Sequence, residues 1–366
     1  MKILVVCKRQ YTGRDLLDDQ YGRLFEIPEE LARLGHQVKG LAVSYRRRNE
    51  GVFTPKDVEW QSFNALPIIG HAKIIKAIRT AIAQFDPDII WASSDASIVH
   101  CSATACNEQE KPFVVDFYDN YGSFMLTKLP LMKKMLYSAC LKSVGITAVT
   151  QLLSEHLRDR GISQGIPISV LGNGINASLF YVRETGACRQ ALSLPAEALL
   201  VGTAGALDSS RGIRVLFDAF EIASRELDNL HLVVAGPRDG TIDAYTNPRI
   251  IDLGNRSPTD IPVVLGALDL AIICNLDSDF GRFCYPQKLE EMLACRLPFL
   301  AANVGELARV LPLSHQFQAR SSTDLAKKIL QSFSGENTQE QIKASTWKQR
   351  AEALATFFDT VKTFDR

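Results

Sequence analysis

A lysine and a glutamate lie three residues apart near the start of an expected helix, in YPQKLEEMLACRLPFLA (285–301). The partial positive charge at a helix N-terminus favours acidic residues, so Lys288 works against the dipole. Leu289 and Met292 have the spacing of a buried face, which places Lys288 and Glu291 together on the other side. There the lysine could neutralise a phosphate, and the glutamate could accept hydrogen bonds from ribose hydroxyls. An ordinary ion pair on a solvated face fits the spacing equally well.

A glycine-containing loop with an arginine follows an expected strand in GTAGALDSSRGIRVLFDAF (202–220). The strand ends near Thr203, and we expect the next helix to begin near Arg211 and Gly212. The amides of the loop at Gly205 and the helix dipole would favour an anion, onto which Arg211 could direct two hydrogen bonds. A plain strand–helix turn with a surface arginine is the alternative, and the local context alone favours it.

Polar residues also end an expected strand in VVDFYDNYGSF (114–124). Asp116, Tyr118 and Asp119 stand at the carboxyl end of this strand, where the residues of a binding cleft are expected. The pair Asp-Asn also favours turns, so strand-end capping explains the same residues.

The connection after the first expected strand, CKRQYTGRDLLDDQYGRLFE (7–26), is long for a strand–helix loop. Loops of this length in compact domains are often binding loops or lids. It contains Gly13, Gly22 and Arg23 but no GxGxxG pattern, which disfavours a Rossmann site for NAD.

A basic segment, LPLMKKMLYSACLKSVG (129–145), has the pattern of an amphipathic helix. Its lysines and apolar residues, with the residue before it, are Lys128, Lys133, Lys134, Lys142, Leu129, Leu131, Met132, Leu136 and Leu141. Together with YRRR (45–48), the helix could dock on an anionic membrane surface. A solvated basic face over an ordinary core stripe is the simpler interpretation.

The composition limits the classes of protein that these residues can serve. The chain has 366 residues, of which 46% are hydrophobic, enough to form two cores. Basic and acidic residues number 41 each, so nucleic acid is not an expected partner. Eight cysteines without CxxC spacing indicate reduced thiols. We expect a cytoplasmic protein, because MKILVVC is too short for a signal peptide and no run approaches the ~20 apolar residues of a membrane span.

Apolar strands alternate with amphipathic helices along the whole chain. The expected strands include KILVV, VKGLAV and FVVDFYD in the first half, and ALLVGTAG, LHLVVAG, LDLAIIC and LPFLAA in the second. This alternation predicts parallel sheets with helices on both faces. The pattern restarts after VLGNGINASLF (170–180), where we place a joint. Two doubly wound domains in tandem could direct the carboxyl ends of their strands to a shared cleft, where such sheets bind ligands.

The order of these segments resembles the family 4 retaining glycosyltransferases of the GT-B fold over nearly the whole chain. RLGHQV resembles the end of the family's first helix, VLGNGINASLF its linker, GALDSSRG its phosphate loop, LVVAGPRDG its GxGP segment, and YPQKLEEMLACRLPFLA its donor helix. The resemblance implies a Rossmann-like acceptor domain over 1–172, a Rossmann-like donor domain over 173–345, and a helix over 346–366 that packs back on the N-terminal domain.

The resemblance further implies a hexosyltransferase-type enzyme that moves a sugar from a nucleotide-diphosphate donor to an acceptor hydroxyl with retention. No essential metal and no cofactor besides the donor substrate are expected. The acceptor would be a polysaccharide, a lipid-linked glycan or a small glycoside precursor, with possible contact to the inner membrane face. The expected donor-binding residues are Gly205, Arg211, Gly212, Lys288 and Glu291, with Gly13 and Gly22 of the first loop, and the expected catalytic residues are Tyr118 and Asp119.

Three positions depart from the family pattern. Ala206 stands where many members have an arginine, Phe283 where they have an acid, and Tyr118 where they have a histidine. Two other functions therefore stay open. One is a GT-B nucleotide-sugar 2-epimerase, and the other is a non-catalytic protein that binds nucleotides or glycans.

Overall fold

The structure, a computed structural model, describes residues 1–11, 14–337 and 339–362. The chain divides into two compact units, which are described separately. Unit 1 runs from Met1 to Gly174 and also includes the helix that begins at Trp347, whereas unit 2 spans Ile175–Thr346. The division follows Gly174, two residues beyond the boundary expected from the sequence.

Unit 1 is built on one mostly parallel sheet. Its elements are β1 (Lys2–Lys8), β2 (Gln10–Tyr11), β3 (Arg14–Asp15), α1 (Arg23–Arg33), β4 (Gln37–Ser44), β5 (Gly51–Phe53), β6 (Glu59–Asn64), α2 (His71–Phe85), β7 (Ile89–Ser93), α3 (Ala96–Glu108), β8 (Phe113–Phe117), η1 (Tyr121–Ser123), η2 (Met125–Lys128), α4 (Pro130–Lys142), β9 (Gly145–Ala148), α5 (Gln151–Asp159), β10 (Ile168–Val170) and α12 (Trp347–Lys362). The strand order is β10-β9-β8-β7-β1-β4-β6-β5, with β5 antiparallel to β6. Strands β2 and β3 pair antiparallel in a separate two-stranded sheet.

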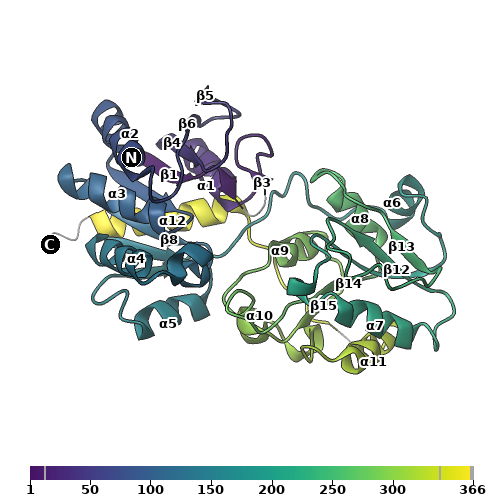
Figure 1. Ribbon diagram of the computed structural model, residues 1–366. Coiled ribbons are helices and arrows are strands. Elements are labelled where there is room, and N and C mark those ends of the chain that lie inside the picture. The colour runs from purple at the N-terminus through teal and green to yellow at the C-terminus, as the bar shows by residue number, and fades with distance from the viewer. Residues whose placement is uncertain (12–13, 338, 363–366) are drawn as a thin grey trace. The chain divides into compact units, whose positions relative to one another are not determined.

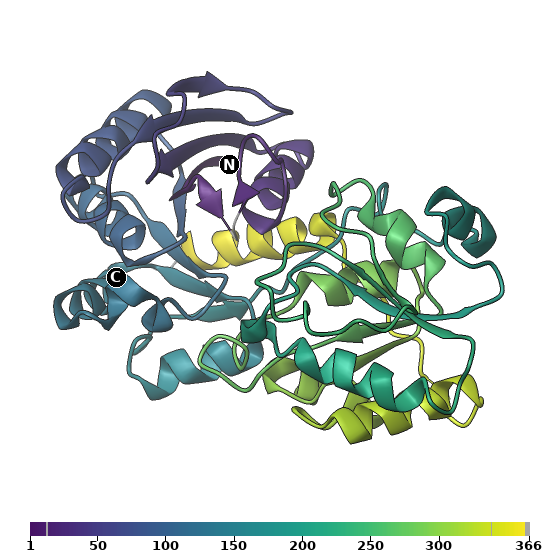
Figure 2. The ribbon, with the colours of Figure 1, turned by 45° about the vertical axis from the view of Figure 1, so that its right-hand side comes forward.

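Helices cover both faces of this sheet. All residues of β7 and β8 are buried, as expected for central strands of a parallel sheet with two covered faces. On one face, Val5 and Phe25 share a core with Leu354 and Phe358, which brings α12 against α1. On the other face, α3 packs between α2 and α4 (Figures 1 and 2).

Unit 2 is built on a parallel sheet throughout its described residues. Its elements are α6 (Thr185–Ala191), β11 (Leu199–Ala204), η3 (Ser209–Arg211), α7 (Arg214–Ala223), β12 (Leu230–Ala235), β13 (Ile250–Asp252), α8 (Ile261–Ala267), β14 (Leu270–Ile273), α9 (Gln287–Ala294), β15 (Phe299–Ala302), α10 (Gly305–Val310), η4 (Leu313–His315), β16 (Gln316–Phe317) and α11 (Ser322–Phe333). The strand order is β13-β12-β11-β14-β15-β16. Separate hydrophobic clusters cover the sheet, one including Leu289 and Met292 of α9 and the other Phe217 and Phe220 of α7.

The predicted class of two doubly wound α/β units is confirmed, and several local expectations change. Helix α7 begins at Arg214 and not near Arg211, because Gly212 has a positive φ of 72° and ends a short 3-10 turn. The expected core stripe of the basic helix is only partly correct. Met132 is buried in α4, whereas Leu131 is 69% exposed and Leu141 is 43% exposed.

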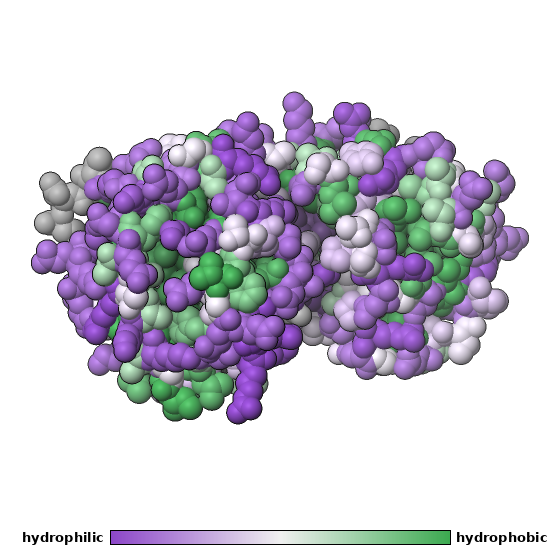
Figure 3. Space-filling model, turned by 90° about the horizontal axis from the view of Figure 1, so that it is seen from above, coloured by the Kyte–Doolittle hydropathy of each residue, from purple (hydrophilic) through white to green (hydrophobic). Residues whose placement is uncertain are grey.

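Most cysteines are buried and the visible surface is mostly hydrophilic, as expected when each unit buries its apolar residues. All eight cysteines are free, and all but Cys274 are buried. On the face seen in Figure 3, hydrophilic residues predominate and hydrophobic residues form smaller patches between them. Among the described residues, no helix has the length and apolar character needed to cross a membrane.

A buried ion pair joins several elements of unit 1 at the carboxyl end of β8. The Arg23 guanidinium lies 2.6 Å from the Asp116 carboxylate, and both side chains are fully buried. Asp116 also accepts hydrogen bonds from Ser93 of β7 at 2.8 Å and from Thr147 of β9 at 2.6 Å. Arg23 donates to the carbonyl oxygen of Leu171 at 2.5 Å. Helix α1, three strands and the end of unit 1 are therefore held by one polar network.

We expect Asp116→Ala to lower the free energy of unfolding of unit 1 by about 3–5 kcal/mol, because the buried Arg23 loses its charge partner. Glu59→Ala is the control, since it breaks an exposed pair with Lys39 that contributes about 1 kcal/mol or less. All three tryptophans belong to unit 1, so their fluorescence during urea unfolding reports this unit. Equal losses in the two variants would contradict the role of the buried pair.

Candidate functional site

The loop that follows β11 is held rigidly against the loop that follows β12. The amide of Gly205 donates to the Ala235 carbonyl, and the amide of Leu207 donates to the Pro237 carbonyl, each at 2.8 Å. A Cβ atom on Gly236 would lie 2.1 Å from the Gly205 oxygen, so only glycine allows this close approach. The loop, residues 205–211, thus has a fixed backbone at the carboxyl end of β11, and we call it the β11 loop.

Lys288 of α9 reaches this loop and joins two stretches that lie far apart in the sequence. Its Nζ atom donates to Thr203 Oγ1 at 3.4 Å. A Cβ atom on Gly205, whose φ is 115°, would lie 2.7 Å from Lys288 Cε. The missing side chain at Gly205 therefore makes the space that Lys288 occupies.

Arg211 and two carboxylates surround the same lysine. Burial lowers the pKa of Lys288, and the Arg211 charge lowers it further, whereas Cys274, Glu291 and Asp208 act to raise it. The Arg211 guanidinium carbon lies 4.4 Å from the centre of the Phe280 ring, which supports its plane. Two cations thus lie near each other at the end of β11, an arrangement suited to an anion of more than one charge.

Helix α9 buries more of its acidic side than its sequence suggests. Leu289 and Met292 are buried as expected, but Glu290 is only 1% exposed and Glu291 is 7% exposed. The alternative of an ion pair on a solvated face is therefore wrong for Glu291. Glu290 has a structural role, because it accepts hydrogen bonds from the Tyr285 hydroxyl at 2.8 Å and from the Ser345 amide at 2.7 Å.

Gly212 is needed for close packing in unit 2 as well as for its positive φ. A Cβ atom at this position would lie 2.7 Å from Leu276 Cδ2. The position thus requires glycine both for its positive φ and for this contact.

The residues of unit 1 that the sequence suggested as site residues lie at different places around the carboxyl ends of the strands. Asp119 is 7% exposed, and its carboxylate accepts the amide of Asn120 at 2.7 Å. The Tyr118 hydroxyl donates to the Ser94 carbonyl at 3.4 Å. Gly22 is the N-cap of α1, with a φ of 85°, and Gly13 lies outside the described residues.

Several residues near Lys288 were not singled out from the sequence. Asp208 caps the 3-10 turn by accepting the amide of Arg211 at 3.2 Å, and the Asp-Ser-Ser spacing is a turn signal that could have identified it. Thr203, which ends a hydrophobic strand, and Phe280, within a polar loop, have no local signal. Their roles depend on contacts between distant segments, because Phe280 lies 69 residues from Arg211 and Thr203 lies 85 residues from Lys288.

We expect Gly205→Ala to lower the melting temperature of unit 2 and to displace Lys288, because the added methyl group would overlap the lysine side chain. The positive φ adds about 1–3 kcal/mol of strain. Gly240→Ala is the matched control, since Gly240 has a φ of 83° and an added Cβ would lie at an ordinary contact distance of 3.4 Å from Asp243 Oδ2. Thermal unfolding followed by circular dichroism makes the comparison, and equal losses would argue against the contact with Lys288.

Comparisons with known proteins agree with this architecture. Residues 23–179 match a family described as Glycosyltransferase Family 4, and residues 198–334 match one described as Glycosyl transferases group 1. No curated protein sequence matches the chain.

Solved structures with a similar fold cover almost the whole chain. A sucrose-phosphate synthase from Thermosynechococcus elongatus has a TM-score of 0.77 at 16% identity, with 98% of each chain covered. A glycosyltransferase from Rickettsia africae has a TM-score of 0.77 at 18% identity, with 100% of this chain and 99% of that chain covered. HepE of Anabaena has a TM-score of 0.71 at 18% identity, with 99% and 97% covered. With the two family matches in the order found here, the chain is a GT-B glycosyltransferase of the family 4 type.

Proposed function

We propose that unit 2 binds a nucleotide-diphosphate sugar and that the enzyme transfers this sugar to an acceptor hydroxyl with retention of configuration. The observation that carries the proposal is the contact of Lys288 with Thr203 in β11, at 3.4 Å, beside the charges of Arg211 and Glu291 that act on the pKa of the lysine. Arg211 and Lys288 would bind the diphosphate, and Glu291 would accept hydrogen bonds from the ribose hydroxyls. The resemblance to family 4 supports retention.

The two cations would also assist the departure of the nucleotide diphosphate. As the bond between the sugar and the diphosphate breaks, negative charge develops on the leaving oxygen, and fixed positive charges stabilise it. Burial and Arg211 lower the pKa of Lys288, so a bound diphosphate would offset an existing electrostatic cost. We therefore propose that Arg211 and Lys288 supply this stabilisation without an essential metal ion.

UDP is the first nucleotide to test, because HepE of Anabaena has been solved in complex with UDP and with UDP-glucose. A thermal-shift series with UDP, GDP, ADP and dTDP sugars would identify the base, since a ligand that binds the folded state raises the melting temperature. The absence of a shift with every nucleotide sugar would argue against the proposed donor.

We expect Arg211→Ala and Glu291→Ala each to weaken binding of the preferred nucleotide diphosphate by about tenfold or more, because each loses a charge-assisted hydrogen bond. Arg214→Ala, on the exposed side of α7, is the matched control and should bind normally. Titration calorimetry measures the affinities, and circular dichroism verifies the fold. Unchanged affinity in both site variants would refute the assigned site.

Tyr118 and Asp119 remain candidates for a role near the acceptor, as the sequence suggested. Transfer assays with donor and an acceptor panel test this role, and an incubation with donor alone tests the epimerase alternative. An epimerised sugar formed without acceptor would favour the epimerase, and binding without any turnover would favour a non-catalytic protein.

We also propose that α4 makes peripheral contact with an anionic membrane. Leu131, Lys134, Ser138, Leu141 and Lys142 have the spacing of one helix face, and all five are exposed. Met125 and Leu129, just before the helix, are 85% and 52% exposed. Apolar side chains could enter the lipid boundary while the lysines contact acidic headgroups. The polysaccharide or lipid-linked acceptors expected from the family resemblance are compatible with this location.

We expect Leu131→Ser combined with Leu141→Ser to reduce sedimentation with phosphatidylglycerol vesicles by severalfold, because two exposed apolar side chains are lost. Leu313→Ser is the control, since Leu313 of unit 2 is 80% exposed outside this face. Binding should also weaken with salt. Salt-insensitive or absent binding of the unmodified protein would eliminate the membrane proposal.

A further inference from the structure

Three consecutive arginines lie in the loop that joins β4 to β5, residues 45–50, which we call the arginine loop. The loop leaves the carboxyl end of β4, and β4 pairs in parallel with β1. Open α/β sheets bind their ligands at this edge. Arg46 and Arg47 are exposed, and neither guanidinium has an ion pair among the residues that the structure describes.

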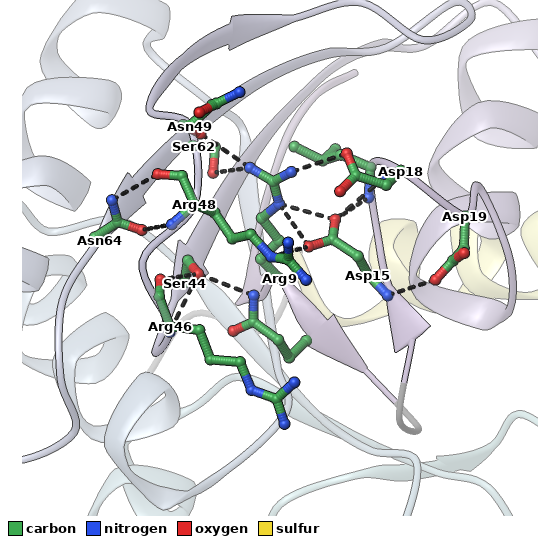
Figure 4. Close-up of polar contacts among 12 residues, drawn as sticks. Arg9, Asp15, Asp18, Asp19, Ser44, Arg46, Arg48, Asn49, Ser62 and Asn64 are labelled. Carbon is green, nitrogen blue, oxygen red and sulfur yellow. Dashed lines mark hydrogen bonds and ion pairs between the residues drawn. The ribbon is translucent and has the colours of Figure 1, made fainter.

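Side chains from neighbouring elements fix the first half of the arginine loop (Figure 4). The Gln10 side chain donates to Ser44 Oγ at 2.9 Å and accepts the amide of Tyr45 at 3.0 Å. Ser44 Oγ donates to the carbonyl oxygen of Arg46 at 2.6 Å. The backbone that carries Arg46 is therefore held on both sides.

The second half of the loop is fixed by a buried arginine and an asparagine. Arg9, only 2% exposed, donates to the Asn49 carbonyl at 3.0 Å, and Asp15 neutralises it at 2.8 Å. Asn64 accepts the amide of Arg48 at 3.0 Å and donates to its carbonyl at 2.8 Å. Four polar side chains, those of Gln10, Ser44, Arg9 and Asn64, thus order the backbone of this loop. Among its three arginines, Arg48 lies within ion-pair distance of Asp15, whereas Arg46 and Arg47 have no ion pair within the described chain.

The acidic residues near the loop pair with cations other than Arg46 and Arg47. Asp15 binds Arg9 and lies 3.6 Å from Arg48, and Glu50 pairs with Lys73. Lys8, at the end of β1, adds a further ammonium group 5.4 Å from the centre of the Tyr45 ring. The resulting surface has positive charge in excess at a fixed position.

We propose that Arg46 and Arg47, with Lys8 beside them, bind a phosphate group on the acceptor substrate. The proposal rests on the proposed transferase function and defines the chemical class of its second substrate. A guanidinium matches the geometry of phosphate with two parallel hydrogen bonds, and a backbone that is already ordered reduces the entropy lost on binding. The phosphate would anchor the acceptor at the carboxyl end of β4 and β1.

The arginine loop is distinct from the α4 face considered for membrane contact. Helix α4 follows β8, and β7 and β1 separate β8 from β4 in the sheet. At about 4.8 Å per strand, the two strand ends lie on the order of 14 Å apart. The arginine loop is therefore separate from the α4 face to which we assign membrane contact. This separation favours an acceptor phosphate over a membrane surface as its ligand.

The test compares the intact protein with the double variant Arg46→Ala/Arg47→Ala. Arg158→Ala/Arg160→Ala is the control, because it removes two exposed arginines from another part of unit 1. Calorimetric titrations are made with UDP present in excess, so that the site proposed in unit 2 is filled. The probes are inorganic phosphate, glucose 6-phosphate and farnesyl phosphate, paired with glucose and farnesol. The sugar and prenyl probes distinguish a soluble acceptor from a lipid-linked one.

The intact protein and the control should prefer at least one phosphate ester to its unphosphorylated partner, and the double variant should lose that preference by about tenfold or more. No preference in the intact protein, or a preference retained by the double variant, would overturn the proposal. Loss of vesicle binding with the phosphate preference unchanged would reassign the loop to the membrane. Failure of UDP to bind would instead count against the proposed donor site, and the phosphate titrations can still be made without UDP.

Discussion

The fully buried guanidinium of Arg23 joins several elements of unit 1. Removal of a charged group from water is so costly that its environment must supply a partner charge and hydrogen-bond acceptors. Arg23 obtains them from Asp116 and from the Leu171 carbonyl, so the position of α1 is tied to β8 and to the segment at Leu171. Ser93 and Thr147 complete the carboxylate's hydrogen bonds from the strands on either side. The edge of the sheet where ligands are expected is therefore rigid before any ligand arrives.

Unit 2 reaches a comparable rigidity with glycine. Gly236 allows the β11 loop to approach the neighbouring strand end, and Gly205 leaves room for Lys288. The absence of a side chain at Gly205 leaves the space that Lys288 occupies, so that this lysine of α9 can reach the β11 loop. The two units thus place charged groups at the carboxyl ends of their strands by different means, a buried ion pair in one and missing side chains in the other.

The sequence predicted the fold class because strand and helix periodicities are local. The buried Leu289 and Met292 of α9 follow directly from such a pattern. The burial of Glu291 and the position of Lys288 over Gly205 could not be predicted, since they depend on segments far apart along the chain. The family resemblance supplied their candidate roles. The arginine loop shows the same limit, because three arginines in sequence do not reveal that their backbone is fixed by Gln10, Arg9 and Asn64.

The hydrogen bond between Glu290 and the Ser345 amide has a practical consequence for anyone who wishes to isolate unit 2. A fragment that stopped before residue 345 would leave one oxygen of a side chain that is 1% exposed without its backbone donor, on the helix that also carries Lys288 and Glu291. An expression fragment of this unit should therefore retain the peptide through Thr346, where a bridge to Ile175 also closes its two ends.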